Sequence, residues 1–168
     1  VLDKFNLSDE TIKNCEKINI IACGTAYHAG VIGKYAIEKL ARIPVEVEVA
    51  SEFRYRDPIV NDRQITIVMS QSGETLDTLM AMREAKKKGS TTLAIVNVVG
   101  SSIAREADDV LYTWAGPEIA VASTKAYNTQ VAALYLVAIS FARRKGLLDD
   151  ETYKKYLEEL QEIPGHVE

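Results

Sequence analysis

The stretch Ile65-Thr66-Ile67-Val68-Met69, followed directly by Ser70-Gln71-Ser72-Gly73-Glu74-Thr75, decides the fold of this chain of 168 residues. A short, continuous run of β-branched and apolar residues is typical of a buried strand. Residues 76–88 then carry apolar side chains at the spacing of an amphipathic helix. The polar cluster 70–75 therefore lies where a buried strand ends and a helix begins.

The cluster 70–75 has the chemistry of a site for a phosphate-sized anion. The first N–H groups of a helix have no partners within the helix, and the helix dipole is positive at that end. Three hydroxyls, one amide and one glycine lie at this point, and no lysine or arginine. Capping, with Ser72 as the N-cap, explains one hydroxyl but neither the other two nor Gln71. We therefore predict an anion site built from neutral donors.

Length and composition are those of one globular domain, with 47% hydrophobic and 26% charged residues. The net charge of −4 argues against a nucleic-acid surface, which needs a clustered basic face. No apolar region is long enough to predict a membrane span. Cys15 and Cys23 are too few for a disulfide scaffold and lack partners at metal-ligand spacing. We therefore expect a cytoplasmic protein without a metal site.

Apolar runs alternate with helical patterns along the chain. We expect strands at 18–23, 45–49, 65–69, 92–96 and 109–114, and helices at 8–17, 24–42, 76–88, 123–145 and 149–163. Such alternation is typical of an α/β protein with a parallel sheet covered on both faces. The second and fifth strands are half polar, which suits sheet edges, whereas the other three are continuously apolar. We therefore predict a five-stranded parallel sheet in the order 2-1-3-4-5.

This strand order brings two polar clusters to one crevice. In doubly wound sheets, ligands bind outside the carboxyl ends of strands where the strand order reverses. Cys23-Gly24-Thr25 ends the first strand there, and the cluster 70–75 ends the third. The first cluster lacks the three-glycine fingerprint, so we expect no nicotinamide cofactor. Without a base or carboxylate partner, Cys23 and His28 are more typical of structural residues than of catalytic ones.

A third polar segment, 116–125, opens the longest predicted helix. Ser123 and Thr124 are candidates for its N-cap. Lys125 is unfavourable near the positive end of a helix dipole, so it needs a negative partner. Both a ligand and the carboxylate of Glu118 remain open as that partner.

Four motifs resemble a known family when they are taken in order. They are Ala-Cys-Gly-Thr at 22–25, Val-Ala-Ser-Glu-Phe-Arg-Tyr at 49–55, Ser-Gln-Ser-Gly-Glu-Thr at 70–75 and Val-Ala-Ser-Thr-Lys-Ala at 121–126. From about residue 18 to 146, this series resembles the first sugar-isomerase (SIS) subdomain of the glutamine–fructose-6-phosphate aminotransferase family. The resemblance implies a flavodoxin-like, three-layer α/β/α sandwich that binds fructose 6-phosphate or glucosamine 6-phosphate without a cofactor.

The resemblance also implies which residues form the site. The implied substrate-binding residues are Gly24, Thr25, Ser70, Gln71, Ser72, Thr75 and Ser123. The residues implied to line the same pocket are Cys23, Ala26, Gly73, Val121 and Ala122. Ala26 stands where the family usually has serine, so only the backbone amide at this position can contact the ligand.

The resemblance further divides the chain into an initial helix at 1–17, a sugar-phosphate domain at 18–146 and a connector helix at 147–168. In the family, the acid–base residues belong to a second SIS subdomain and the C-terminal tail, so we expect no catalytic residue here. The implied partners are that second subdomain, a glutaminase domain and a second subunit in a homodimer. The first residue, Val1, is not methionine, which agrees with a segment of a longer protein.

Two other functions remain open at this point. A non-catalytic SIS module that senses a sugar phosphate would have the same pocket. A single-SIS phosphosugar isomerase would need a histidine and a carboxylate at the crevice. His28 with Glu52 or Glu118 are the candidates for that pair.

Overall fold

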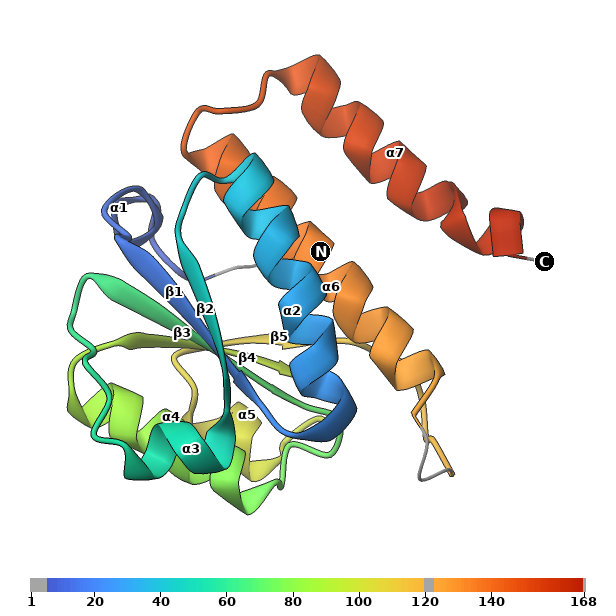
Figure 1. Ribbon diagram of the computed structural model, residues 1–168. Coiled ribbons are helices and arrows are strands. Elements are labelled where there is room, and N and C mark those ends of the chain that lie inside the picture. The colour runs from blue at the N-terminus through green and yellow to red at the C-terminus, as the bar shows by residue number, and fades with distance from the viewer. Residues whose placement is uncertain (1–5, 120–122, 168) are drawn as a thin grey trace.

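The computed structural model describes residues 6–119 and 123–167 and has a parallel sheet between layers of helices (Figure 1). The five strands have the order β2-β1-β3-β4-β5. Both the predicted strand order and the three-layer α/β/α architecture are confirmed. The elements in chain order are α1 (Asp9–Lys13), β1 (Lys17–Ala22), α2 (Gly24–Leu40), β2 (Val45–Val49), α3 (Ala50–Tyr55), β3 (Gln64–Ser70), α4 (Leu76–Lys87), β4 (Thr91–Val96), α5 (Ser102–Glu106), β5 (Asp109–Tyr112), α6 (Lys125–Arg144) and α7 (Asp150–Val167).

The position of each strand in the sheet follows from its polarity. β3 is buried at every residue, because it pairs with β1 on one side and β4 on the other. β2 alternates valine with glutamate and lies at one edge, where the glutamates reach solvent or ion pairs. β5 forms the opposite edge and is buried only at alternate residues. The expectation that half-polar strands take the edges is confirmed.

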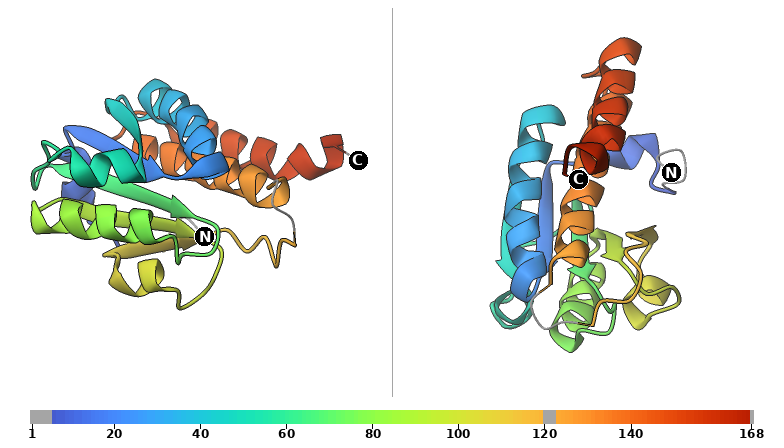
Figure 2. Two further views of the ribbon diagram at one scale, coloured as in Figure 1. Left: turned by 60° about the horizontal axis from the view of Figure 1, so that its bottom comes forward. Right: turned by 90° about the vertical axis from the view of Figure 1, so that its right-hand side faces the viewer.

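Helices α2 and α6 cover one face of the sheet and pack side by side (Figures 1 and 2). Their apolar faces bury Ile20 and Ile67 of the sheet together with Leu134 and Phe141 of α6. Gly33 of α2 lies directly against Leu134, since a Cβ at Gly33 would be 2.5 Å from Leu134 Cδ1. The missing side chain at position 33 therefore permits the close approach of the two helices.

Helices α3, α4 and α5 cover the other face of the sheet (Figure 2). Phe53, Met82 and Ile103, one from each helix, pack with Val68 and Ala94 of the sheet. The sequence did not predict α3 or α5. Helices of five or six residues are too short to show a helical period.

The two helices α1 and α4 differ in how their first turn is capped. Ser8 caps α1, and its Oγ accepts a hydrogen bond from Thr11 N at 3.0 Å. Ser72, which the alternative to an anion site makes the N-cap of α4, does not hold that position. Thr75 holds it, and its side chain makes no capping hydrogen bond. The residues before α4 therefore form a separate loop that keeps its hydroxyls for other contacts.

The C-terminal helix α7 lies outside both layers and packs against α6 (Figure 1). Tyr153, Tyr156, Leu157 and Leu160 form a half-buried stripe along one side of it. Ile163 extends this stripe and is 48% exposed. Neither this helix nor any other in the described residues has the length and apolar character to cross a membrane.

We predict that Gly33→Ala lowers the free energy of unfolding by about 1–3 kcal/mol, because it overpacks the contact with Leu134. Urea-induced unfolding measures the change. Gly165→Ala is the matched control, because no heavy atom lies within 4 Å of its Cβ position. Equal stability of Gly33→Ala and the unchanged protein would show that the two helices separate freely at this point.

Candidate functional site

The polar clusters of the sequence meet in a cavity of about 430 Å³ at the carboxyl ends of β1 and β3. The start of α6 closes its third side. The residues of the predicted site that line this cavity are Cys23, Gly24, Thr25, Ala26, Ser70, Gln71, Ser72, Thr75 and Ser123. Parallel strands end at the same edge of a sheet, which explains why clusters far apart in the sequence meet here.

The loop after β3 is folded around its own hydroxyl groups. Ser70 Oγ accepts a hydrogen bond from Gly73 N at 3.0 Å and lies 2.9 Å from Thr75 Oγ1. Ser72 Oγ accepts from Glu74 N at 3.2 Å. Ser70 itself is buried. These contacts hold the loop in one shape while hydroxyl protons remain for a ligand.

Gly73, which the resemblance implies for the pocket, is not among the residues that line this cavity. It lies behind the loop with a φ of +67°, and a Cβ there would be 2.0 Å from Ser101 Oγ. Glu74 also faces this side, where its carboxylate accepts from Ser102 N at 2.7 Å. The Ser102 side chain and then its backbone N–H lower the pKa of Glu74 by hydrogen bonding to the carboxylate. The short helix α5 thus supports the loop from behind.

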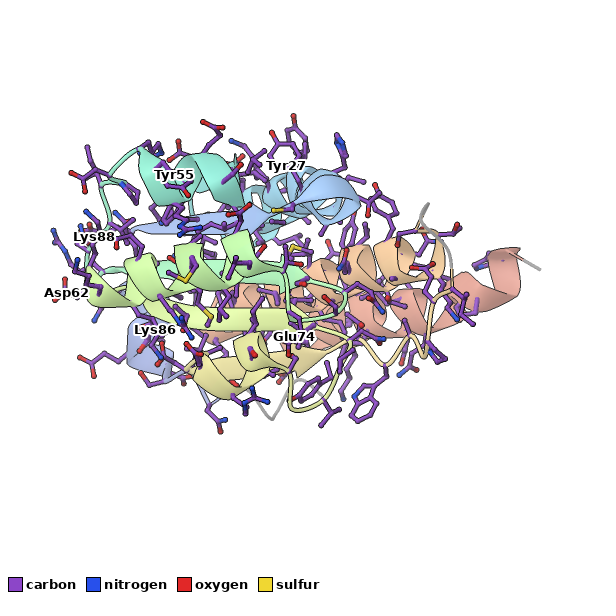
Figure 3. The ribbon with its side chains drawn as sticks, turned by 90° about the horizontal axis from the view of Figure 1, so that it is seen from below. Tyr27, Tyr55, Asp62, Glu74, Lys86 and Lys88 are labelled. Carbon is purple, nitrogen blue, oxygen red and sulfur yellow. The ribbon has the colours of Figure 1, made fainter. Side chains whose placement is uncertain are left out.

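The basic residues at the end of α4 lie away from this site. Figure 3 shows Lys86 and Lys88 at the opposite end of α4 from Glu74. Lys86 pairs with Asp108 at 2.8 Å and Lys88 with Asp57 at 2.6 Å. These lysines form surface ion pairs and contribute nothing to the cavity wall.

Helix α2 contributes its N-terminus to the cavity. Cys23 occupies the N-cap position and its side chain makes no capping hydrogen bond, so it leaves the first N–H groups of α2 uncapped. Such groups bind anions well. The Cys23 thiol is half buried, 3.8 Å from Thr78 Oγ1. No group of three metal-ligating side chains occurs among the described residues.

Glu118 holds the start of α6. Its carboxylate accepts from Thr124 N at 2.9 Å, Lys125 N at 3.2 Å and Ser123 Oγ at 2.8 Å. The Thr124 N–H and then the Ser123 hydroxyl lower the pKa of Glu118. Thr124, one of the two N-cap candidates, holds the N-cap position of α6, but its side chain makes no capping hydrogen bond, and the Glu118 carboxylate accepts from the first N–H groups instead. Lys125 meets Glu118 through its backbone N–H.

Sequence reasoning missed Gln130 and Met69 in the cavity wall. Gln130 is only 3% exposed and lines the cavity, and its amide is not among the buried side-chain atoms that lack a hydrogen-bond partner in the described residues. It is a polar residue on the face of α6 that otherwise carries Ala126, Ala133 and Leu134. That break in an apolar stripe is the pattern that could have identified it.

Of the residues named from the sequence, His28 lies outside the cavity wall, and two others lie outside the described residues. His28 is exposed, does not line the cavity, and packs edge-on against Tyr27 with ring centroids 5.4 Å apart. The cavity thus lacks the histidine that a single-SIS isomerase would need. Val121 and Ala122 lie outside the described residues.

A second cavity of about 480 Å³ adjoins the first and shares Gln71 and Glu118 with it. Asn97 lies in its wall, but the Asn97 amide is engaged with Thr113, Ala115 and Gly116 of the loop after β5. Trp114 and Val98 make much of the remaining wall apolar. The convergence of free polar groups therefore distinguishes the first cavity.

Comparison with known proteins identifies the family. The model of the SIS domain matches residues 11–140. The chain therefore belongs to the SIS-domain family. The polar loop after β3 and the helix starts around the cavity are part of the matched segment.

Particular relatives come from one class of enzyme. The chain is 64% identical over 168 residues to a glutamine–fructose-6-phosphate aminotransferase (isomerizing) of Caldanaerobacter subterraneus subsp. tengcongensis. This alignment covers all of the chain. The chain is 47% identical over 167 residues to the enzyme of that name from Methanosarcina mazei, covering 99% of this chain. The chain spans 28% and 27% of the length of these two relatives.

Solved structures agree with this relationship. The C-terminal domain of a glucosamine–fructose-6-phosphate aminotransferase from Francisella tularensis matches 97% of this chain and 46% of its own, with 46% identity and a TM-score of 0.91. A glucosamine-6-phosphate deaminase from Thermotoga maritima matches 88% of this chain and 47% of its own, with 21% identity and a TM-score of 0.72. The second likeness concerns the fold alone.

We predict that Gln130→Met changes the free energy of unfolding by less than about 1 kcal/mol, because the Gln130 amide lines the cavity, where water can serve it, and the substitution nearly keeps the side-chain volume. Methionine keeps the unbranched shape of glutamine. Thermal and urea unfolding measure the change. Gln161→Met on the exposed side of α7 is the control and should shift stability by less than about 0.5 kcal/mol. A larger loss of stability in Gln130→Met would reveal a structural role for the amide.

The lowered pKa of Glu118 predicts how the start of α6 responds to acid. The hydrogen bonds of the ionised Glu118 carboxylate contribute their full stability at a pH above the ordinary glutamate pKa of about 4.3. This stability is lost as the pH falls through the lower pKa that Glu118 has in the folded protein. In ¹H–¹⁵N spectra, the amide signals of Thr124 and Lys125 should therefore titrate with a midpoint below about 4.3. Glu118→Gln should abolish this titration. A midpoint at or above the ordinary value would refute the interaction.

Proposed function

We propose that this chain forms the phosphate-binding half of the isomerase site of a glutamine–fructose-6-phosphate aminotransferase. Its ligand is fructose 6-phosphate or the product, glucosamine 6-phosphate. The observation that carries this proposal is the convergence of uncharged donors in one cavity: three hydroxyls of the 70–75 loop, the Gln71 amide and the N-terminus of α2. The relatives named above support the choice of ligand.

Neutral donors suit a ligand that must bind and then leave. A phosphate ester at neutral pH carries a charge near −2 and oxygen atoms that accept hydrogen bonds strongly. The described cavity wall contains no lysine or arginine. Hydroxyls, an amide and helix N–H groups can therefore surround the phosphate without the strong attraction of a full positive charge.

The proposal assigns binding to this chain and the proton transfers to other parts of the enzyme. Isomerisation of a sugar phosphate needs an acid and a base within reach of the carbon atoms. The described cavity wall offers Glu118 but no histidine or lysine. Because the chain spans 28% of a relative's length, we infer that a second SIS domain supplies those groups.

We also infer the remaining partners from the proposed parent enzyme. A glutaminase domain would supply the nitrogen, and two subunits would associate as a homodimer in the cytoplasm. The half-buried apolar stripe of α7 supports a contact with a further domain, because a helix with such a face is stabilised by packing. No cofactor and no nucleic acid enter this proposal, which needs only the sugar phosphate and the partner domains.

We expect Ser72→Ala to weaken the binding of fructose 6-phosphate by about 1.5–3 kcal/mol, which is the usual contribution of a hydrogen bond to a charged group. Isothermal titration calorimetry of the 168-residue chain measures this change. Ser51→Ala removes a hydroxyl from α3 outside the cavity wall and serves as the matched control. Unchanged affinity in Ser72→Ala would place the phosphate elsewhere, and no binding by the unchanged chain would overturn the proposed function.

A further inference from the structure

Glu118 and Ser123 form the part of the cavity wall that precedes α6. Ser123 Oγ and Glu118 Oε2 lie 2.8 Å apart. The carboxylate is ionised at neutral pH, and an ionised carboxylate accepts hydrogen bonds but donates none. The hydrogen bond must therefore run from the Ser123 hydroxyl to Glu118.

The direction of this hydrogen bond decides what Ser123 can offer to a ligand. A serine hydroxyl has one proton and two lone pairs. Its proton is committed to Glu118, so only lone pairs remain toward the cavity. Ser123 can accept a hydrogen bond from a ligand hydroxyl but cannot donate one to a phosphate oxygen. The negative charge of Glu118 further opposes a phosphate on this side.

The loop after β3 has the opposite character. Ser72 Oγ accepts from Glu74 N, so its own proton is free to be donated. The hydroxyls of Ser70 and Thr75 share one hydrogen bond of 2.9 Å, which leaves one of their two protons for a ligand, whichever of them donates. Phosphate oxygens at neutral pH are almost entirely acceptors. This loop therefore matches a phosphate, whereas the Glu118 side matches hydroxyl groups.

We propose that Glu118 is a positioning residue that keeps Ser123 a hydrogen-bond acceptor and so orients the sugar phosphate in the cavity. The ligand's hydroxyl groups then lie toward α6 and its phosphate toward the 70–75 loop. This inference rests on the proposed function and adds a role for Glu118 that acts through Ser123. A ligand without a hydroxyl at the α6 side gains nothing from this pair.

The test exploits a substitution that reverses the hydrogen bond while keeping its shape. In Glu118→Gln, the amide oxygen can still accept from Thr124 N and Lys125 N, whereas the amide nitrogen faces Ser123 and donates to it. Ser123 then accepts with one lone pair and turns its own proton toward the ligand, so one lone pair rather than two remains for a ligand hydroxyl. We expect fructose 6-phosphate to bind up to about tenfold more weakly, the size of one hydrogen bond, because the charge-assisted bond that fixed the Ser123 hydroxyl is lost. Inorganic phosphate, which does not reach Ser123, should bind no more weakly than before.

A double-mutant cycle separates action through Ser123 from direct contact with the ligand. Ser123→Ala should also weaken fructose 6-phosphate about tenfold, and adding Glu118→Gln should then change the affinity less than about twofold. Glu158→Gln on the exposed side of α7 is the control for the change in net charge. Thermal unfolding of each variant verifies that the fold is kept.

The affinities of these variants distinguish a positioning role of Glu118 from direct contact with the ligand. A full tenfold loss from Glu118→Gln in the Ser123→Ala background would show direct contact and overturn the positioning role. Unchanged binding of fructose 6-phosphate by Glu118→Gln would overturn it as well, while leaving the proposed function in place. Equal losses for inorganic phosphate and fructose 6-phosphate would show a general structural effect. Absence of binding by the unchanged chain would overturn the proposed function and this inference together.

Discussion

The hydrogen bonds of Ser70 at the end of β3 are the contacts on which the site depends. One hydroxyl accepts from Gly73 N and pairs with Thr75, so a single buried side chain closes the whole loop. The loop can take this shape because β3 is the central strand and is held on both sides. Its end is therefore a rigid point, and the donors around it keep fixed positions.

The site combines features that are unfavourable for folding with features that support binding. Behind Gly73, Ser101 Oγ is buried and has no hydrogen-bond partner among the described residues. Such a group costs stability. The apolar packing on both faces of the sheet offsets that cost, since it buries large side chains such as Phe53 and Phe141 completely. The apolar core thus supplies the stability that the folded protein needs to keep a pocket of neutral donors.

Most of the fold could be predicted because burial follows strand position. Alternating valine and glutamate in 45–49 marked an edge, and the apolar run 65–69 marked the centre, as the structure confirms. What the sequence did not show is local. The helices α3 and α5 are too short to show a period, and their apolar residues Phe53 and Ile103 pack against the sheet.

By itself, the sequence determined the strand order and the meeting of two polar clusters, because local apolar patterns decide burial and parallel strands share one edge. Only the tertiary structure decided the roles of Glu118 and Gln130. Gln130 reaches the cavity because α6 packs against α2, a contact between residues about a hundred positions apart, and Glu118 lies there because its carboxylate accepts from the first N–H groups of α6. The direction of the Ser123 hydrogen bond also required the structure, since it depends on which acceptor the fold brings within 2.8 Å.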